Sequence, residues 1–415
     1  MIADATAKDR EALSLLTAEA VRSRAQMMLE TGLRDGLVHF RIDLDRMDAV
    51  ADAVVAAVRK NYPSLEIPFH ARWRHFVVDG VDRWGLQATP LSWPDRAARA
   101  RAEFDLAIVS VLLDAGAGSV WRYREALSGR EIGRSEGLAL ASLDMFANGA
   151  FSTRADDPLR VDADVIAGLS GATLAKGFQI SGANALLGLD GRADLLRRLG
   201  KLVSERKEVF ASADTPRPGG LFDHLAARAK NDAIEAQKIL SEVLVQFGPI
   251  WPSRLTLAGY PLGDCWKHPA IKTDDATDGL VPLHKLSQWL TYSLIEPLRR
   301  AGIKVTDING LTGLAEYRNG GLFVDLGVLA LRDGADADRA HEVGSHLVVE
   351  WRALTVALLD RLAEIIRSRL KRTATSLPLA SLLEGGTWAV GRAAAFERRA
   401  DGSPPIKVIS DGTVF

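Results

Sequence analysis

The stretch VGSHLVVEWRALTVALLDRLAEII, residues 343–366, decides the fold class of this chain. Its large apolar residues recur at steps of three and four, which is the period of a helix with one apolar face. They are Val343, Leu347, Trp351, Leu354, Leu358, Leu362 and Ile365. We predict that this segment is the longest helix of the protein, that it begins near Asp336, and that its apolar stripe packs on other elements.

Helical periodicity extends over most of the remaining chain. We predict helices over residues 13–32, 47–61, 94–114, 135–149, 162–174, 221–247 and 284–298. Ser135 is placed to cap the fourth of these helices. Alternating strand patterns are sparse, and residues 65–84 suit a short extended or hairpin segment better than a long helix. The sequence therefore predicts a mainly α fold, a compact multi-helix domain with a few short strands.

The clearest interruption of the pattern is residues 213–220, which contain two prolines followed by two glycines. We expect a surface crossover there rather than a linker between domains. A chain of 415 residues could hold two or three domains of about 150 residues each, but that ratio is a soft guide. We expect a single domain over residues 1–415, either undivided or built of two lobes at about 1–212 and 221–415.

Composition excludes several classes of protein. With 52 Lys and Arg against 53 Asp and Glu, the net charge of −1 argues against a general nucleic-acid binder. The single cysteine, Cys265, can form no intrachain disulfide and no cysteine-based metal module. The amino terminus lacks the basic and then apolar pattern of a signal peptide, and no stretch resembles a membrane span. These observations predict a cytoplasmic protein that does not associate with membranes.

Motifs for metals and cofactors are incomplete. His341 and His346 lie five residues apart, which turns their side chains about 140° from each other on a helix, whereas a zinc-protease helix needs a spacing of four. The glycines near Lys176 lack the Gly-Lys-Ser/Thr core of a phosphate loop. No Gly-x-Ser-x-Gly elbow is present, and the neighbours of Cys265 do not favour a thiolate. We predict no metal site and no cofactor.

Polar and aromatic residues are concentrated between residues 251 and 325, in otherwise apolar surroundings. Such density is typical of the lining of a pocket. The candidates there include Asp264, His284, Lys285, Gln288, Trp289, Glu316, Tyr317 and Arg318. Similar clusters occur at residues 72–76, at Asp114 with residues 121–124, and at residues 134–136.

A structural explanation exists for each of these residues taken singly, because charged groups pair across helix interfaces and tryptophans fill cores. For the sequence Glu316-Tyr317-Arg318, which lies between glycine turns, we favour a binding site. An adjacent carboxylate, phenol and guanidinium are costly to bury without partners, and a ligand would offset that cost.

Several long motifs resemble the uracil catabolism protein 4 family. They are RWRHF (72–76), LDAGAGSVWRYR (113–124), PGGLFD (218–223), GPIWPS (248–253), GDCW (263–266) and LTGLAEYRNGG (311–321). The resemblance extends from about residue 37 to residue 370. It implies a role in pyrimidine degradation, beside a cyclohydrolase-like companion that opens the uracil ring.

The segment 285–329 is also similar, more distantly, to the queuosine salvage nucleosidases, which are mainly helical and resemble DNA glycosylases. Glu316-Tyr317-Arg318 and the sequence LGVL (326–329) match that family's Asp-Tyr-Arg and Leu-Gly-Val-Leu pattern. Asp114 falls where the family has an aspartate before a small turn. Two positions depart from the pattern: Glu316 replaces an aspartate, and Ser293 stands where the family has another carboxylate, a role that Glu296 could take.

This likeness implies a small-molecule ribosyl substrate. Cleaving a ribosyl C–N bond passes through an oxocarbenium-like sugar, which a carboxylate can stabilise while another group moves protons. We predict that Glu316, Tyr317 and Asp114 are the catalytic residues. We predict that Arg318 and Lys285 hold a phosphate, that Trp289 or Trp121 covers a planar leaving group, and that Gln288, Asp264 and His284 complete the binding site.

The function that these observations favour is hydrolysis of the N-ribosyl bond of a ring-opened pyrimidine nucleoside or nucleotide, such as a ribosylurea, with release of urea or a ureide. A non-catalytic ligand-binding or scaffold protein of the same pathway is the alternative. A transferase or lyase that acts on the same sugar is a third. The sequence does not set the oligomeric state.

Overall fold

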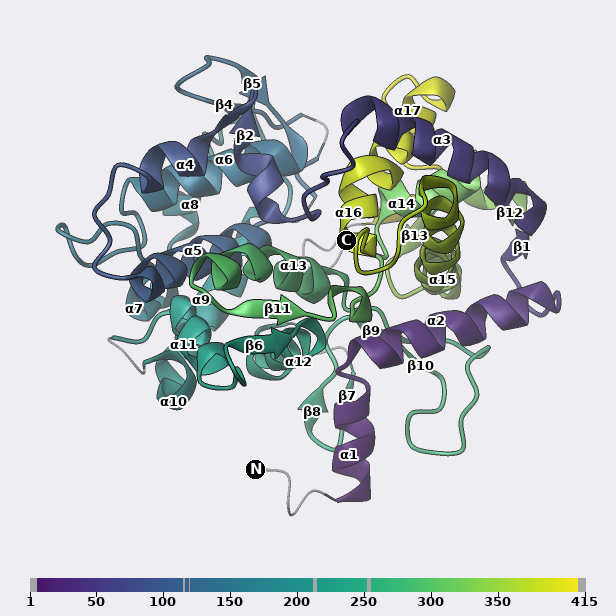
Figure 1. Ribbon diagram of the computed structural model, residues 1–415, viewed down its shortest axis with the longest axis horizontal. Coiled ribbons are helices and arrows are strands. Elements are labelled where there is room, and N and C mark those ends of the chain that lie inside the picture. The colour runs from purple at the N-terminus through teal and green to yellow at the C-terminus, as the bar shows by residue number, and fades with distance from the viewer. Residues whose placement is uncertain (1–5, 115, 119, 212–214, 252–254, 410–415) are drawn as a thin grey trace.

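Helices dominate the computed structural model, which describes residues 6–114, 116–118, 120–211, 215–251 and 255–409 (Figure 1). The mainly α fold with a few short strands is therefore confirmed. The α-helices up to the crossover are α1 Ala7–Ser14, α2 Ala18–Leu33, α3 Met47–Asn61, α4 Arg83–Ala88, α5 Arg96–Leu112, α6 Arg134–Ala147, α7 Ala163–Ala167, α8 Gly171–Gly177, α9 Leu189–Glu205 and α10 Lys207–Phe210. Those after it are α11 Leu221–Ala226, α12 Ala236–Phe247, α13 Lys285–Arg300, α14 Tyr317–Asp325, α15 His346–Leu370, α16 Leu379–Leu382 and α17 Trp388–Arg398.

The strands are short and form two-stranded ribbons within the described residues. The pairs are β1 Phe40–Ile42 with β12 Leu329–Leu331, β2 Val77–Val78 with β3 Val81–Asp82, β4 Tyr123–Arg124 with β5 Glu131–Ile132, β6 Ala233–Glu235 with β11 Lys304–Thr306, β7 Thr256–Leu257 with β8 Tyr260–Pro261, β9 Cys265–Lys267 with β10 Leu280–Pro282, and β13 Ala340–Glu342 with β14 Lys407–Ile409. The ribbons β6–β11 and β13–β14 are parallel, and the others are antiparallel.

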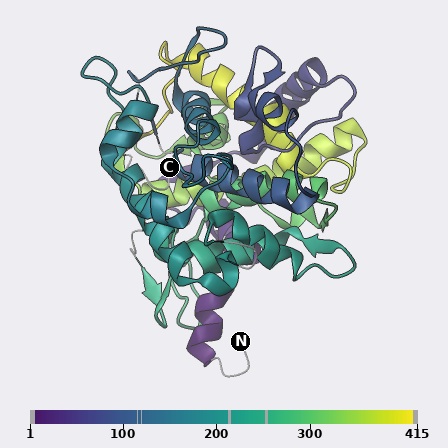
Figure 2. The same ribbon diagram turned by 90° about the vertical axis from the view of Figure 1, so that its left-hand side faces the viewer.

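The longest helix is α15, which packs against α2, α3 and α14 on one side of the molecule (Figure 1). Its predicted apolar stripe is buried apart from Ile365, which is half-buried. The predicted start near Asp336 is wrong, because the chain first forms β13 and the Ser345 hydroxyl caps the helix. Because α2 and α3 come from the first half of the chain, distant segments share one core. In two views at right angles, α1 extends away from the other helices (Figure 1 and Figure 2).

Three other predicted helices are divided. Residues 13–32 fall on α1 and α2, which Thr17 separates by capping the second. The segment 162–174 forms α7 and α8, and Ser170 caps α8 in the same way. The segment 221–247 is interrupted by β6, which needs an extended backbone to pair with β11. By contrast, the helix predicted over 47–61 is confirmed at both ends, and those predicted over 94–114 and 284–298 are confirmed within two residues at each end.

Residues 72–76 form a 3₁₀ turn, η2, before the β2–β3 hairpin. The hairpin itself is confirmed within residues 65–84. Its two-residue turn, Asp79-Gly80, has φ values of 50° and 77°, which matches the right-handed twist of the flanking strands. The helix α4 then starts at Arg83.

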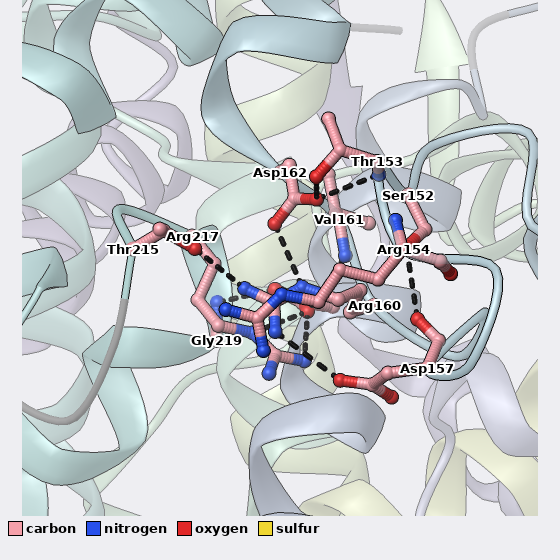
Figure 3. Close-up of polar contacts among 11 residues, drawn as sticks. Ser152, Thr153, Arg154, Asp157, Arg160, Val161, Asp162, Thr215, Arg217 and Gly219 are labelled. Carbon is pink, nitrogen blue, oxygen red and sulfur yellow. Dashed lines mark hydrogen bonds and ion pairs between the residues drawn. The ribbon is translucent and has the colours of Figure 1, made fainter.

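The predicted surface crossover is partly buried, although residues 213 and 214 lie outside the described residues. Arg217, Pro218, Gly219 and Gly220 are buried. A Cβ on Gly219 would lie 2.3 Å from the Arg101 carbonyl oxygen, so the glycine serves close packing rather than mobility. The segment is fixed by Arg160, which is 1% exposed and donates to Asp162, Asp157 and Thr215 (Figure 3).

No helix among the described residues has the length and apolar character that a membrane crossing requires.

Candidate functional site

A cavity of about 70 Å³ lies where the start of α14 meets α13, α6 and α17. Six of the predicted site residues line it: Asp114, Lys285, Trp289, Glu316, Tyr317 and Arg318. The other lining residues are His70, His75, Arg134, Ser135, Glu136, Leu314, Trp388 and Arg392. The described part of the structure thus brings together carboxylates, cations and aromatic rings from segments that are far apart in the sequence.

Glu316 is the N-cap of α14. Its Oε2 accepts the backbone N–H of Arg318 at 2.7 Å, and its Oε1 accepts that of Asn319 at 2.6 Å. A glutamate can serve here because its backbone is extended (φ −123°, ψ 162°), so the longer side chain folds back onto the first turn. Burial raises the pKa of Glu316, against the opposing effects of these two N–H groups and of Lys285. The carboxyl group is therefore held in one orientation and is more easily protonated than an exposed glutamate.

Asp114, at the end of α5, is the second carboxylate of the cavity. The Ser135 hydroxyl donates to both of its oxygens, at 2.8 and 2.7 Å. This corrects the expectation that Ser135 caps α6, because the helix begins one residue earlier and the hydroxyl turns to Asp114. Arg72 Nη1 lies 3.3 Å from Asp114 Oδ1, and Arg72 is fully buried. The Asp114 carboxylate is thus held between a buried guanidinium and a hydroxyl donor.

Lys285, the first residue of α13, lies close enough to Asp114 and Glu316 to interact with both charges. Burial lowers its pKa, and these two carboxylates oppose that effect. Among the described residues, no carboxylate oxygen lies within 4.0 Å of its ammonium group, so it forms no direct ion pair there. Its charge is available to an anionic group of a ligand.

Aromatic rings form a second side of the cavity. The ring centroid of Trp289 lies 5.4 Å from that of His75 and 6.3 Å from that of His70, and His70 lies 6.4 Å from Trp388. The Arg72 guanidinium lies 5.4 Å from the Trp289 ring centroid. The indole N–H of Trp289 is buried and has no hydrogen-bond partner in the described structure. A buried donor without a partner is rare, and a ligand acceptor would satisfy it.

A second, larger cavity of about 410 Å³ shares His75, Arg134, Glu136 and Arg392 with the first. Arg122 and Arg130 also line it. Because the two cavities share these residues, we treat the larger one as the entrance to the smaller. A ligand could place a small planar group in the inner cavity and an anionic group near the arginines of the outer one.

Two predicted binding residues, Gln288 and Trp121, lie outside the inner cavity and form hydrogen bonds with neighbouring segments. Gln288 is fully buried and accepts the Thr312 N–H at 2.9 Å, which holds the loop that leads to Glu316. Trp121 is also fully buried, and its indole N–H donates to the Phe178 carbonyl at 2.9 Å. The structure therefore favours Trp289 rather than Trp121 as the ring that faces a ligand.

Asp264 and His284 are likewise structural in this geometry. Asp264 accepts hydrogen bonds from both terminal nitrogens of Arg352 and from the backbone N–H of Lys285. The ring of His284 is bound through Nε2 to the Leu15 carbonyl at 2.9 Å, and burial lowers its pKa, so it is neutral. Both residues fix the start of α13, where Lys285 lies.

Ser293 stands where the resemblance to the queuosine salvage nucleosidases implies a carboxylate, and its contacts are structural. Ser293 is fully buried, and its hydroxyl accepts the Arg72 N–H at 2.9 Å. Glu296, the suggested substitute, is outside the cavity lining and pairs with Arg74 at 2.9 Å. Ser293 thus fixes the backbone of Arg72, and neither Ser293 nor Glu296 lines the inner cavity.

Sequence reasoning missed His70, Trp388 and Arg392, which no motif connects to the rest of the site. The residue clusters noted at 72–76 and 134–136 do supply His75, Arg134, Ser135 and Glu136. A signal that could have pointed to the carboxyl-terminal part is the pair Gly385-Gly386, which lies just before Trp388.

No group of three or more His, Cys, Asp or Glu side chains able to hold a metal ion occurs in the described residues. His341 is bound to the Asp336 carbonyl at 2.7 Å, whereas His346 packs on His268 with ring centroids 5.0 Å apart. Cys265 is buried, and burial raises the pKa of its thiol. The lining residues of the inner cavity supply carboxylates, imidazoles and cations.

Comparison with known proteins places the chain in a family. A family model described as a protein of unknown function, DUF1688, matches residues 14–415. Protein urg3 of Schizosaccharomyces pombe is 40% identical over 413 residues, covering 97% of this chain and 98% of the relative. Uracil catabolism protein 4 of Lachancea kluyveri is 37% identical over 411 residues, covering 91% and 92%. The resemblance to the uracil catabolism protein 4 family is confirmed, and the chain belongs to the DUF1688 family.

Proposed function

We propose that this protein acts in pyrimidine catabolism and hydrolyses the N-ribosyl bond of a ring-opened pyrimidine nucleoside or nucleotide, releasing urea or a ureide. The name of one relative, uracil catabolism protein 4, supports the pathway. The observation that carries the reaction is the pair of buried carboxylates, Asp114 and Glu316, which both lie close to Lys285 in an aromatic cavity.

The two carboxylates differ in a way that suits them to two tasks. Asp114 is held in place by Arg72 and the Ser135 hydroxyl, so its carboxylate can stabilise the positive charge that develops on the sugar. Glu316, whose pKa is raised by burial, can carry the proton that the departing nitrogen needs. A division between an ionised and a protonatable carboxyl group is the usual arrangement for cleaving a bond at an anomeric carbon.

The other lining residues fit the two ends of a ribosylurea. A planar urea group would stack on Trp289, and the unpartnered indole N–H would donate to the urea carbonyl. Tyr317 would orient a ribose hydroxyl. Lys285 and Arg318, together with the arginines shared by the outer cavity, would bind a 5′-phosphate.

A non-catalytic ligand-binding protein is the second candidate, and one observation favours it. Both oxygens of Glu316 already accept backbone N–H groups, so the residue could serve the fold alone as a helix cap. The two functions make opposite predictions for variants of this residue.

The test is incubation of the purified protein with ribosylurea and with its 5′-phosphate, using uridine and its monophosphate as controls. Urea and free sugar are followed by mass spectrometry. We expect release from one form, loss of turnover in Glu316→Gln, and nearly unchanged ligand affinity in that variant. Glu316→Asp keeps a capping carboxylate, so it should stay folded yet turn over slowly, because the acid is withdrawn by one methylene.

Ligand-dependent thermal stabilisation without any release would support the binding protein instead. If neither release nor stabilisation occurs with any of these compounds, the proposed substrate class is wrong.

A further inference from the structure

We infer that His70, held by Glu384, is the base that takes a proton from the attacking water. This inference rests on the proposed hydrolysis for the identity of the reaction. The evidence for the inference is the arrangement of hydrogen bonds around the imidazole ring, and this arrangement can be tested without any substrate.

The first observation is the orientation of the ring. His70 Nδ1 lies 2.8 Å from Glu384 Oε2. A carboxylate only accepts hydrogen bonds, so Nδ1 carries a proton, and the lone pair of the neutral ring is then on Nε2. His70 lines the inner cavity and Glu384 does not, so the ring places Nδ1 away from the cavity and leaves Nε2 for it. His70 is 8% exposed, which limits competition from bulk water.

The second observation is that the backbone fixes both partners. The His70 N–H donates to the Ala380 carbonyl at 2.9 Å, and the Ser381 hydroxyl donates to the Ile67 carbonyl at 3.0 Å. Glu384 lies on a π-helical turn, Leu383–Thr387, a local form that is frequent at functional sites.

Two glycines in that turn allow it to approach its neighbours closely. A Cβ on Gly385 would lie 2.8 Å from Ile67 Cδ1, and one on Gly386 would lie 2.6 Å from Val54 Cγ1. The position of Glu384 is thus set by close packing on α3 and on the segment before His70. The imidazole and its carboxylate are held in place before any ligand binds.

The third observation separates His70 from the other imidazole of the cavity. His75 Nδ1 lies 3.3 Å from Arg72 Nη1. A guanidinium only donates, so Nδ1 of His75 accepts and its Nε2 carries the proton. Burial and the charge of Arg72 hold the pKa of His75 well below its usual range. Of the two imidazoles, only His70 therefore offers a lone pair to the cavity.

The step balances with groups already described. The water oxygen forms a bond to the anomeric carbon, and the C–N bond breaks with its electron pair remaining on nitrogen. His70 Nε2 takes the water proton, and Glu316 gives its proton to the departing nitrogen. The proton on His70 then returns to Glu316 through solvent, which restores the protein. His70 and Glu316 are close enough for their charges to interact.

Several ionisable groups face this pair. Glu384 and Tyr62 lie on the far side of the ring, and burial, with Glu384 as the next cause, raises the pKa of Tyr62. Glu316, His75 and Lys285 face it from the cavity. Glu384 is the group that holds Nδ1, so its loss should leave the ring free to present either nitrogen to the cavity.

The kinetic test compares three variants. We expect His70→Gln to lower kcat by about 10²- to 10⁴-fold with little change in KM, and to remove the acidic limb of the profile. Glu384→Gln should lower kcat less. His224→Gln is the matched control, because His224 pairs with Glu242 at the same 2.8 Å and is 9% exposed, but neither residue lines the cavity. It should lose stability without changing kcat or the pH profile.

A structural role for His70 would give equal losses of stability in His70→Gln and His224→Gln, with a pH profile that keeps its shape. That result would overturn the inference. A second check is imidazole added to His70→Gly, which should restore part of the turnover if the ring acts as a base.

Nitrogen-15 spectroscopy of the histidine side chains tests the inference without turnover. The chain has eight histidines, and the signal of His70 is assigned by its absence from His70→Gln. We expect the Nδ1–H tautomer in the wild-type protein and its loss in Glu384→Leu, which leaves Nδ1 without that acceptor. An Nε2–H tautomer in the wild-type protein would overturn the inference, even if urea is released. If no urea is released but the Nδ1–H tautomer is found, the proposed reaction fails while the assignment of a basic nitrogen in the cavity stands.

Discussion

Arg352, in the second turn of α15, binds the carboxylate of Asp264 through both terminal nitrogens, each at 2.8 Å. The same guanidinium donates from Nε to the Ala315 carbonyl at 3.2 Å, and Asp264 accepts the backbone N–H of Lys285 at 3.0 Å. One buried ion pair thus fixes the residue before Glu316 and the first turn of α13. Both sides of the inner cavity depend on it.

The ion pair between Asp264 and Arg352 should make the free energy of unfolding depend on pH in the acidic range. Burial alone would raise the pKa of Asp264, but Arg352 and the other donors lower it to about 2. An unfolded aspartate titrates at about 3.9, so the stabilisation is complete above that pH and is lost as the pH falls toward 2. The difference corresponds to roughly 2 kcal/mol. We expect the difference in unfolding free energy between wild type and Asp264→Asn to shrink between about pH 4 and pH 2, as measured by urea denaturation.

Removing the other partner gives a related prediction. Arg352→Met leaves the carboxylate buried without its cation and should cost about 3–5 kcal/mol at pH 7. The double variant Asp264→Asn/Arg352→Met should recover part of that loss. Additive losses in this cycle would show that the two residues act independently.

Trp289 and Trp121 should respond differently to replacement by phenylalanine. Trp289→Phe removes the unpartnered N–H from the cavity and should raise KM for a ribosylurea about tenfold, with little effect on stability. Trp121→Phe removes the bond to Phe178 and should cost about 1–3 kcal/mol of stability with an unchanged KM. Thermal unfolding and steady-state kinetics on both variants distinguish the roles, and a reversed pattern would restore Trp121 as the ligand-facing ring.

Two glycines within helices should respond in opposite directions to alanine. A Cβ on Gly391 of α17 would lie 2.2 Å from the Arg318 carbonyl oxygen, so Gly391→Ala should separate α17 from α14 and cost about 1–3 kcal/mol. Gly191 of α9 has no atom within 4 Å of the equivalent position, so Gly191→Ala should gain about 0.5–1 kcal/mol. If calorimetry shows the same change in stability for both variants, α17 is not closely packed on α14 at Gly391.

Lys285 gives a prediction about the charge of the substrate. Its ammonium has no direct carboxylate partner among the described residues, so Lys285→Met should weaken binding of the 5′-phosphate more than binding of the free nucleoside. Affinities of the two compounds, measured by calorimetry, give the comparison. Equal losses for both would place the phosphate elsewhere.

The sequence predicts helices well where the apolar period is long and uninterrupted, as in α3, α5 and α13. It fails where a few residues need to pair with a distant strand. The helix predicted over 221–247 contains β6 because Ile234 pairs with Val305, a contact that periodicity cannot reveal. The start of α15 was misplaced for the same reason, since β13 pairs with β14.

The candidate site shows a similar limit. Residues that share one turn, such as Glu316, Tyr317 and Arg318, could be predicted as a group from their neighbours. The roles of Gln288 and Asp264 could not, because a polar residue on a helix or loop looks the same whether it faces a ligand or another segment. His70 and Trp388 come together only through the packing of α3 against the π-helical turn.

The distance along the chain between His70 and Glu384, 314 positions, has a consequence for biosynthesis. A nascent chain that has already exposed Asp114, Lys285 and Glu316 still lacks the carboxylate that orients the imidazole. Under the proposed reaction, a product shortened before the segment that carries Glu384 should turn over slowly even if its other helices were folded, because nothing would hold the imidazole in its orientation.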